Sequence, residues 1–132
     1  QRIALFDGRS HDCLEAADGV LVASGTATLE TALFGKPMVI AYRMPATSYW
    51  LMKQMGTVGF IGLPNILAGE SLVPELIQHE ATAQRLADEL LSMLDDRPRC
   101  ERLRERFAAM HESLRRDTPR LAAEAIMATM KR

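Results

Sequence analysis

The sequence has 132 residues, of which 48% are apolar and 25% are charged, and 16 lysines and arginines nearly balance 17 aspartates and glutamates to leave a net charge of -1. A chain of this size can bury a hydrophobic core without a metal or a disulfide, which excludes extensive disorder. The balanced charge argues against a dedicated nucleic-acid-binding protein, because such proteins carry a basic surface.

The two cysteines, Cys13 and Cys100, lie far apart and fit neither a CxxC motif nor a zinc-binding spacing. We therefore expect no disulfide scaffold, no structural metal site and a reducing compartment. No apolar run approaches the ~18 residues of a membrane-spanning helix, and no signal peptide opens the sequence, so we expect a soluble or peripheral protein. Because Gln1 leads directly into an apolar run, we also expect the sequence to begin inside a domain.

Short apolar runs alternate with helical segments in the first half of the chain. In chain order we predict strands at 2–6, 20–23 and 38–42 and helices at 11–17, 27–34 and 45–55. The run Val20–Ala23 is apolar throughout, as in a strand that is covered on both faces of a parallel sheet. A strand–helix–strand unit of this length joins parallel strands by a right-handed crossover. The pattern predicts an α/β fold with a Rossmann-like parallel sheet.

The second half of the chain changes to successive helices at about Thr82. Before this point we expect a short strand at 59–63, a loop at 64–69 and a bridging apolar–polar segment at 72–78. After it, capping residues and prolines predict a C-terminal helical extension with helices at 83–94, 99–114 and 120–130. We therefore divide the single, incomplete domain 1–132 into a β/α portion at 1–81 and a helical portion at 82–132.

The junction VASGTATLE at residues 22–30 is the most informative segment. Here a strand ends, a glycine permits a tight turn, and a helix begins with free backbone N–H groups at the positive end of its dipole, which is a geometry that binds phosphate. The donors are the backbone N–H groups of Gly25, Thr26 and Ala27 and the hydroxyls of Ser24 and Thr26. One turn further, Glu30 can accept hydrogen bonds from two ribose hydroxyls. The alternative is that Ser24 or Thr26 only caps the helix and Glu30 only complements its dipole.

Three motifs in a fixed order resemble one enzyme family. They are SGTATLE at 24–30, GKPMVIAYR at 35–43 and LPNILAG at 63–69. In sequence and separation they resemble lipid-A-disaccharide synthases of Gram-negative bacteria, which are two-domain glycosyltransferases of the GT-B type. The likeness extends from about Asp7 to about Leu94, and more loosely beyond. It implies that the chain corresponds to about the last third of such an enzyme, within the nucleotide-sugar-binding half.

The resemblance implies the transfer, with inversion, of 2,3-diacylglucosamine from UDP to 2,3-diacylglucosamine 1-phosphate, which forms the lipid A disaccharide and UDP. Carried over by motif, the residues that bind the UDP-sugar are Ser24, Gly25, Thr26, Glu30, Arg43 and Asn65. The first three would hold the diphosphate and Glu30 the ribose. Asn65 would approach the diphosphate or the donor sugar, and Arg43 would add positive charge. The family implies no metal or cofactor, and its catalytic base is expected in the absent N-terminal half, so this chain alone should be inactive.

The resemblance also implies a cytoplasmic location, with peripheral contact to the inner membrane. The Met- and aromatic-rich segment at 42–55 fits a lipid-facing helix, although such a stripe also fits a buried core. In the family, C-terminal helices pack back across the other domain and can exchange between the subunits of a homodimer. The arginine-rich stretch at 97–106 is interleaved with glutamates, which favours a solvated helix face over a nucleic-acid site.

Two alternatives remain open at this point. The first is another enzyme of related fold, such as a GlcNAc transferase of peptidoglycan synthesis or a UDP-GlcNAc epimerase, which also place a glutamate after a glycine turn. The second is a non-catalytic ligand-binding or assembly module whose exposed helices recruit a partner. A response of residues 24–30 to UDP would distinguish the enzymes from such a module.

Overall fold

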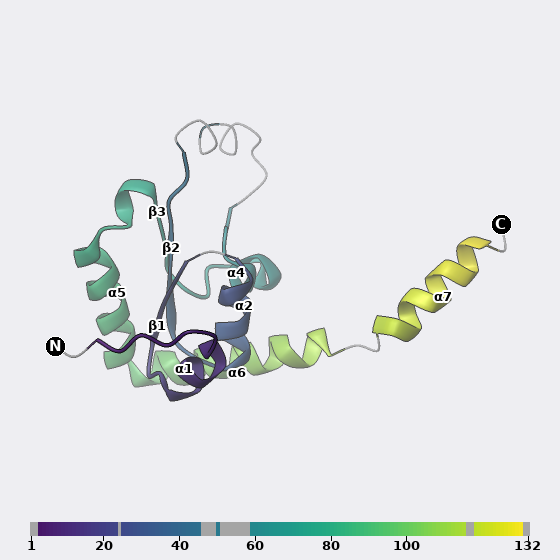
Figure 1. Ribbon diagram of the computed structural model, residues 1–132, viewed down its shortest axis with the longest axis horizontal. Coiled ribbons are helices and arrows are strands. Elements are labelled where there is room, and N and C mark those ends of the chain that lie inside the picture. Colours follow the sequence, from purple (N-terminus) through teal and green to yellow (C-terminus); the bar gives the residue numbers. More distant parts are fainter. Residues whose placement is uncertain (1–2, 24, 46–49, 51–58, 116–117, 131–132) are drawn as a thin grey trace.

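The structure is a computed structural model that describes residues 3–23, 25–45, 50, 59–115 and 118–130. One sheet of three parallel strands has the order β1-β2-β3 (Figure 1). The strands are β1 (Val20–Ala23), β2 (Met38–Tyr42) and β3 (Glu75–Ile77). Because the strands are parallel, with Ala23 opposite Ala41 in β2, their carboxyl ends lie at the same edge of the sheet. The predicted α/β fold with a Rossmann-like parallel sheet is confirmed.

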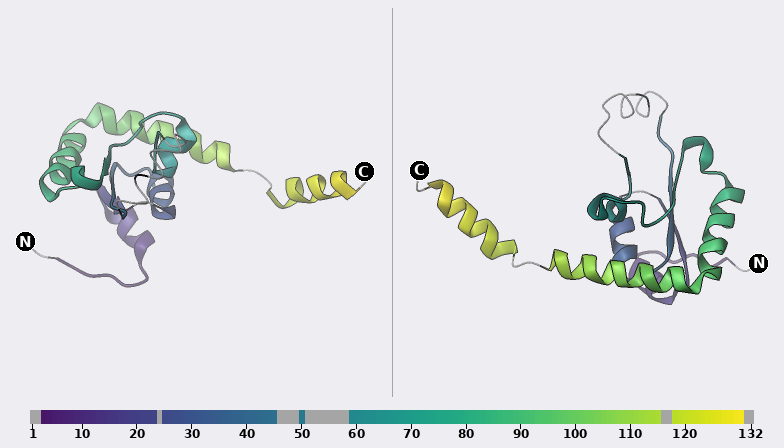
Figure 2. Two further views of the ribbon diagram at one scale, coloured as in Figure 1. Left: turned by 90° about the horizontal axis from the view of Figure 1, so that it is seen from above. Right: turned by 180° about the vertical axis from the view of Figure 1, so that it is seen from behind.

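Helices surround this sheet. In chain order they are α1 (Ser10–Ala16), α2 (Thr26–Leu33), α4 (Leu63–Ala68), the short 3-10 helix η1 (Gln78–Glu80), α5 (Ala83–Asp95), α6 (Arg97–Leu114) and α7 (Thr118–Met130). Helix α5 packs against β1 and β2 on one side, whereas α2 and α4 lie together on the other side (Figure 1, Figure 2). Helix α6 runs across the end of the sheet where the strands begin and contacts α2, α4 and α5.

The core is built around β2, the central strand. Its residues Met38 and Ile40 are at most 1% exposed, and they join a buried cluster with Met93 of α5 and Phe107 of α6. Burial of one such large apolar side chain contributes about 1.5–3 kcal/mol. The apolar sides of α5 and α6 therefore hold these helices against the strands, and α6 lies at the opposite end of the sheet from its carboxyl edge.

The expected strand at 2–6 is wrong in the part that the structure describes. Residues 3–6 lie outside the sheet, and the side chains of Ile3, Leu5 and Phe6 are mostly exposed. An apolar run becomes a strand only where a neighbouring strand pairs with its backbone N–H and C=O groups. Among the described residues this run pairs with none of the three strands, and it leaves the outer edge of β1 without a partner strand.

The region before β3 also differs from the expectation. No strand forms at 59–62, and the expected loop at 64–69 is the helix α4. Pro64 suits the first turn of a helix because its missing N–H needs no partner there, and Gly69 ends the helix in the left-handed conformation with φ 69°. The bridging segment at 72–78 contains β3. A helix this short is hidden from sequence periodicity, which needs several turns.

The three predicted C-terminal helices are confirmed as α5, α6 and α7, with ends that differ by one or two residues. The expected helix at 45–55 lies almost entirely outside the described residues. Helix α7 extends away from the rest of the molecule, and its apolar residues Leu121, Ile126 and Met130 are exposed (Figure 1). Within the described ranges, every helix is too short or too polar to cross a membrane.

Candidate functional site

The candidate site lies where β1 ends and α2 begins, at the carboxyl edge of the sheet. Gly25 immediately precedes α2 and has φ 125° and ψ -159°, a backbone conformation that L side chains rarely adopt. A Cβ atom built on Gly25 would meet no atom within 4 Å, so the space beside this turn is open. Ser24, the preceding residue, lies outside the described residues.

The first turn of α2 is held by a buried side chain, and no described side chain caps its backbone N–H groups. The buried Thr28 hydroxyl donates to the Gly25 carbonyl oxygen at 2.7 Å, and the Thr28 backbone N–H donates to the same oxygen at 3.1 Å. Within the described part of the chain, no side chain caps this helix. The first N–H groups of a helix have no acceptor inside it. Among the described residues, the N–H groups of Gly25, Thr26 and Ala27 therefore have no acceptor within the helix.

Thr26 does not cap α2, because the capping position belongs to Gly25 and Thr26 is the first residue of the helix itself. Its side chain is exposed. The capping alternative is thus excluded for Thr26. A hydroxyl beside an uncapped helix start can donate to the same anion as the backbone N–H groups, so the predicted role of Gly25 and Thr26 in phosphate binding stays a prediction.

Glu30 lies one turn after Thr26 on α2 and is partly exposed. Among the described residues its carboxylate has no hydrogen-bond or ion-pair partner. It lines a cavity of about 350 Å³ together with residues of α1 and β1, most of them apolar, which include Leu14, Val20 and Leu21. A carboxylate with unused acceptors beside an open helix start can receive hydroxyl groups of a ligand.

Arg43 follows β2 at the same edge, but its guanidinium group is engaged within the protein. Its Nε donates to the Gln78 carbonyl oxygen at 3.2 Å, and its Nη2 donates to the Ala81 carbonyl oxygen at 2.9 Å. Arg43 therefore ties the end of β2 to both ends of η1. Its positive charge lies at the carboxyl edge, whereas two of its donors are already used.

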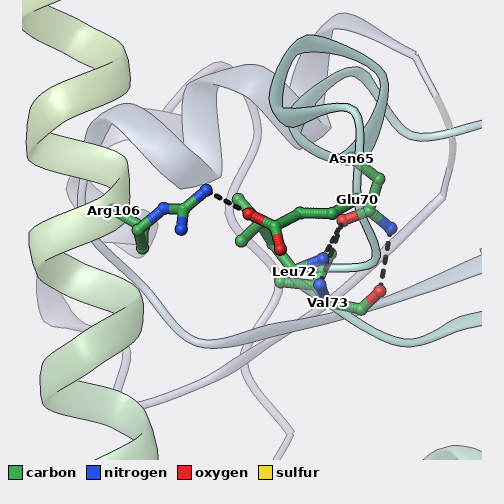
Figure 3. A network of polar contacts seen from close by, with 5 residues as sticks. All are labelled: Asn65, Glu70, Leu72, Val73 and Arg106. Carbon is green, nitrogen blue, oxygen red and sulfur yellow. Dashed lines mark hydrogen bonds and ion pairs between the residues drawn. The ribbon is translucent and has the colours of Figure 1, made fainter.

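Asn65 is fully buried in α4, and all of its hydrogen-bonding capacity is used inside the protein. Its amide nitrogen donates to the Val73 carbonyl oxygen at 2.9 Å and to Glu75 Oε1 at 2.8 Å. Its amide oxygen accepts from the backbone N–H groups of Leu72 at 2.8 Å and Val73 at 3.0 Å (Figure 3). Two donors and two acceptors are all that an Asn side chain offers. The geometry does not present Asn65 to a ligand together with Gly25 and Glu30.

A second contact strengthens the same region. Glu70, which follows α4, pairs with Arg106 of α6, and Figure 3 shows this ion pair beside the bonds of Asn65. The Asn65 bonds tie α4 to the segment before β3, and the ion pair ties that segment to α6. Asn65 therefore acts as a buried connector in this fold.

Sequence reasoning missed two residues that shape the site. Thr28 holds the turn at Gly25, and Glu75 of β3 accepts the Asn65 amide. A signal for Glu75 was present, because a carboxylate within the apolar stretch VPELI must find buried partners or reach solvent. Within the described ranges no cluster of His, Cys, Asp and Glu is suited to hold a metal ion.

Comparisons with known proteins agree on one family. A family model described as lipid-A-disaccharide synthetase matches residues 2–128. Proteins named lipid-A-disaccharide synthase are 54% identical over 125 residues in Azoarcus sp., 50% identical over 125 residues in Saccharophagus degradans and 48% identical over 130 residues in Cupriavidus pinatubonensis.

These matches cover 95% of this chain for the first two relatives and 98% for the third, but only 32% of each relative. The chain thus spans about a third of the length of the curated relatives that it matches. Because the family model covers almost the whole chain, this chain belongs to the lipid-A-disaccharide synthetase family.

Proposed function

We propose that this chain is the UDP-sugar-binding part of a lipid-A-disaccharide synthase. The reaction is the transfer, with inversion, of 2,3-diacylglucosamine from UDP to 2,3-diacylglucosamine 1-phosphate, with the lipid A disaccharide and UDP as products. The observation that carries the proposal is the uncapped start of α2 at Gly25, with the unpartnered carboxylate of Glu30 one turn further, in a chain of this family.

In this proposal the diphosphate binds at Ser24, Gly25, Thr26 and the N–H of Ala27. Negative charge accumulates on UDP as the glycosidic bond to the donor sugar breaks. Backbone donors that are already oriented at a helix start stabilise that charge without rearrangement. Glu30 lies one turn further along α2 and accepts hydrogen bonds from the ribose hydroxyls.

Arg43 and Asn65 take supporting parts in the same proposal. Arg43 adds positive charge at the carboxyl edge while it holds η1 through two carbonyl oxygens. Asn65 fixes α4 beneath the edge through its four hydrogen bonds inside the protein.

We assign no catalytic residue to this chain, and we infer that the base that deprotonates the acceptor lies in the part of the relatives that the chain does not match. A hydrogen bond to a charged group contributes about 1.5–3 kcal/mol before ordering costs are subtracted, whereas micromolar affinity needs about 8 kcal/mol. The chain alone should therefore bind UDP at roughly millimolar concentration and catalyse no transfer.

The proposed setting is the cytoplasmic face of the inner membrane, where acylated substrates reside. Trp50, in the Met- and aromatic-rich segment at 42–55, is 61% exposed, which supports the lipid-facing alternative over a buried core at this residue. The extended, exposed helix α7 supports a contact with the rest of the enzyme or with a second subunit. These contacts are part of the proposal. We also propose that residues 1–132 belong to one nucleotide-sugar-binding domain, with a β/α portion at 1–81 and a helical portion at 82–132.

The test is an NMR titration of the chain with UDP. We expect concentration-dependent shifts of the amide resonances of residues 25–30, with smaller shifts elsewhere. Pyrophosphate should reproduce the shifts of Gly25 to Ala27 but not that of Glu30. If UDP perturbs none of these resonances, the chain is better described as a non-catalytic assembly module.

A chimaera separates the synthase from related enzymes. In it this chain replaces the matching third of the Azoarcus sp. relative. We expect the chimaera to use UDP-diacylglucosamine and to leave UDP-GlcNAc unused. Efficient use of the unacylated donor would favour a GlcNAc transferase or an epimerase.

A further inference from the structure

The connection between β2 and α4 is fixed at both ends by side chains from one short stretch of chain. It leaves the sheet at Met44 and returns at Ile61 and Gly62. Gln78 holds the departing end, and Glu75 holds the returning end. These two residues lie three positions apart, at the start of β3 and directly after it.

Gln78 has an unusual backbone for its residue type. Its φ is 56°, and among the described residues it is the single non-glycine residue with positive φ. Its side-chain amide pairs with the backbone of Met44: the Met44 N–H donates to Gln78 Oε1 at 2.8 Å, and Gln78 Nε2 donates to the Met44 carbonyl oxygen at 3.0 Å. Arg43 Nε donates to the Gln78 carbonyl oxygen. Such a conformation persists where surrounding contacts over-determine it, which is common at functional sites.

Glu75 gathers three donors from the returning chain. Its Oε2 accepts from the Ile61 N–H at 2.7 Å, and its Oε1 accepts from the Gly62 N–H at 3.0 Å and from Asn65 Nδ2 at 2.8 Å. A Cβ atom on Gly62 would lie 2.2 Å from the Ile40 side chain, so the returning chain is pressed against β2. A carboxylate serves three donors well because it offers only acceptors.

Helix α4 links these contacts to the proposed nucleotide site. Helix α4 begins directly after Gly62, and it packs against α2, whose first turn is the proposed diphosphate site (Figure 1). The departing end follows β2, which pairs with β1, the strand that precedes Gly25 in the chain. Loss of either anchor would loosen backbone next to β2 or α4, the elements that pack against β1 and α2.

We propose that Glu75 and Gln78 are positioning residues of the nucleotide site. They hold Met44 and the Ile61–Gly62 backbone at the carboxyl edge, so that this edge is preorganised before UDP binds. Neither side chain contacts the ligand in this proposal. The inference rests on the proposed function, since it assigns these residues to the same UDP site.

The experiment compares three variants of the chain. Gln78→Gly removes the anchoring amide, while glycine suits the positive φ, so this variant keeps the backbone conformation that the fold requires. Glu75→Gln replaces one carboxylate oxygen by an NH2 group, so it serves at most two of the three donors, and with its oxygen in the Oε1 position it leaves the Ile61 N–H without an acceptor. Glu70→Gln is the control, because Glu70 is a glutamate of the same region whose ion pair with Arg106 is exposed.

Two quantities are measured for each variant: amide hydrogen exchange and the Kd for UDP from NMR shifts of residues 25–30. We expect Gln78→Gly to speed exchange at Met44 by roughly tenfold or more, and Glu75→Gln to do the same at Ile61 and Gly62. Both should weaken UDP binding by about threefold or more. Glu70→Gln should change neither the exchange nor the Kd.

The outcomes separate this inference from the function on which it rests. Faster exchange with an unchanged Kd for UDP would overturn the positioning role and leave Glu75 and Gln78 as structural residues. Unchanged exchange in Gln78→Gly, which keeps its backbone compatible with the fold, would overturn the anchoring itself. If the unchanged chain shows no response to UDP, the proposed function fails, and the inference fails with it.

Discussion

The helix starts of this molecule fall into two kinds. Helix α5 is capped by Thr82, whose side chain accepts from the Arg85 N–H at 3.3 Å, and α6 is capped by Asp96, whose carboxylate accepts from the Arg99 N–H at 2.9 Å. Helix α2 follows Gly25 and has no such cap in the described part of the chain. Helices α1 and α4 also lack a side-chain cap, but a Cβ atom on Gly62, before α4, would lie 2.2 Å from the Ile40 side chain, whereas the space beside Gly25 is open. A capped start uses its donors within the protein, whereas an uncapped start with open space beside it leaves them available to a ligand.

The comparison distinguishes helix starts that stabilise the fold from a helix start whose N–H groups are available to a ligand. Capping residues at α5 and α6 contribute to stability. Asp96, before α6, lies at the opposite end of the sheet from the carboxyl edge, whereas Thr82, before α5, follows η1 near that edge. The start of α2 lacks the stabilisation of a cap. Its turn is held instead by the buried Thr28 hydroxyl, which donates to the Gly25 carbonyl oxygen. Changes at the two kinds of start should therefore affect different properties, UDP affinity in one case and stability in the other.

The largest effect on UDP binding is expected for Gly25→Ala. A methyl group at φ 125° strains the backbone by about 1–3 kcal/mol and tilts the first-turn N–H groups away from their common target. We expect UDP binding to fall below detection in an NMR titration. Gly8→Ala is the matched control, because Gly8 also has positive φ (67°) and open space but lies away from α2. If Gly25→Ala bound UDP as the unchanged chain does, the open start would have no role in binding.

Glu30→Gln should weaken UDP binding by roughly tenfold, since a hydrogen bond to a charged group contributes about 1.5–3 kcal/mol. Pyrophosphate binding should stay unchanged because it lacks the ribose. Isothermal titration or NMR with UDP and with 2′-deoxy-UDP sharpens the assignment. The two ligands should differ for the unchanged chain and become nearly equal for the variant. An equal loss of affinity for pyrophosphate would place Glu30 elsewhere in the site.

Thr28→Val should weaken UDP binding by about threefold, because it removes the hydroxyl that holds the Gly25 carbonyl oxygen while the backbone bond remains. Thr31→Val is the matched control. Its hydroxyl donates to the Ala27 carbonyl oxygen at 2.7 Å, also in a buried setting, but not to Gly25. Kd values for UDP at one temperature compare the two variants. Equal effects of both would show that helix packing, and not the Gly25 turn, is responsible.

The smallest effect on UDP binding is expected for Asp96→Ala, which removes the cap of α6. Loss of such a cap costs about 0.5–2 kcal/mol of stability, measured as a lower urea midpoint. The Kd for UDP should not change. A clear loss of UDP affinity would mean that the capped and uncapped starts are coupled, and the distinction between them would fail.

Local pattern predicted a large part of the fold. The strands at 20–23 and 38–42, the helices of the C-terminal half and the glycine turn before α2 all depend on residues that are close in sequence. The failures have two separate causes. The run at 2–6 lacked a pairing strand, and α4 was too short to display a helical period.

The sequence by itself determined that a strand, a glycine and a helix would meet at 22–30 and that Glu30 would follow one turn later. Only the tertiary structure decided that Asn65 is buried and that Arg43 is engaged by residues after β3. Arg43 and Gln78 are 35 positions apart, and Asn65 and Glu75 are 10 apart. The partner of a polar side chain depends on which segments the fold brings together. Nothing in the local pattern around Asn65 or Arg43 specifies those segments.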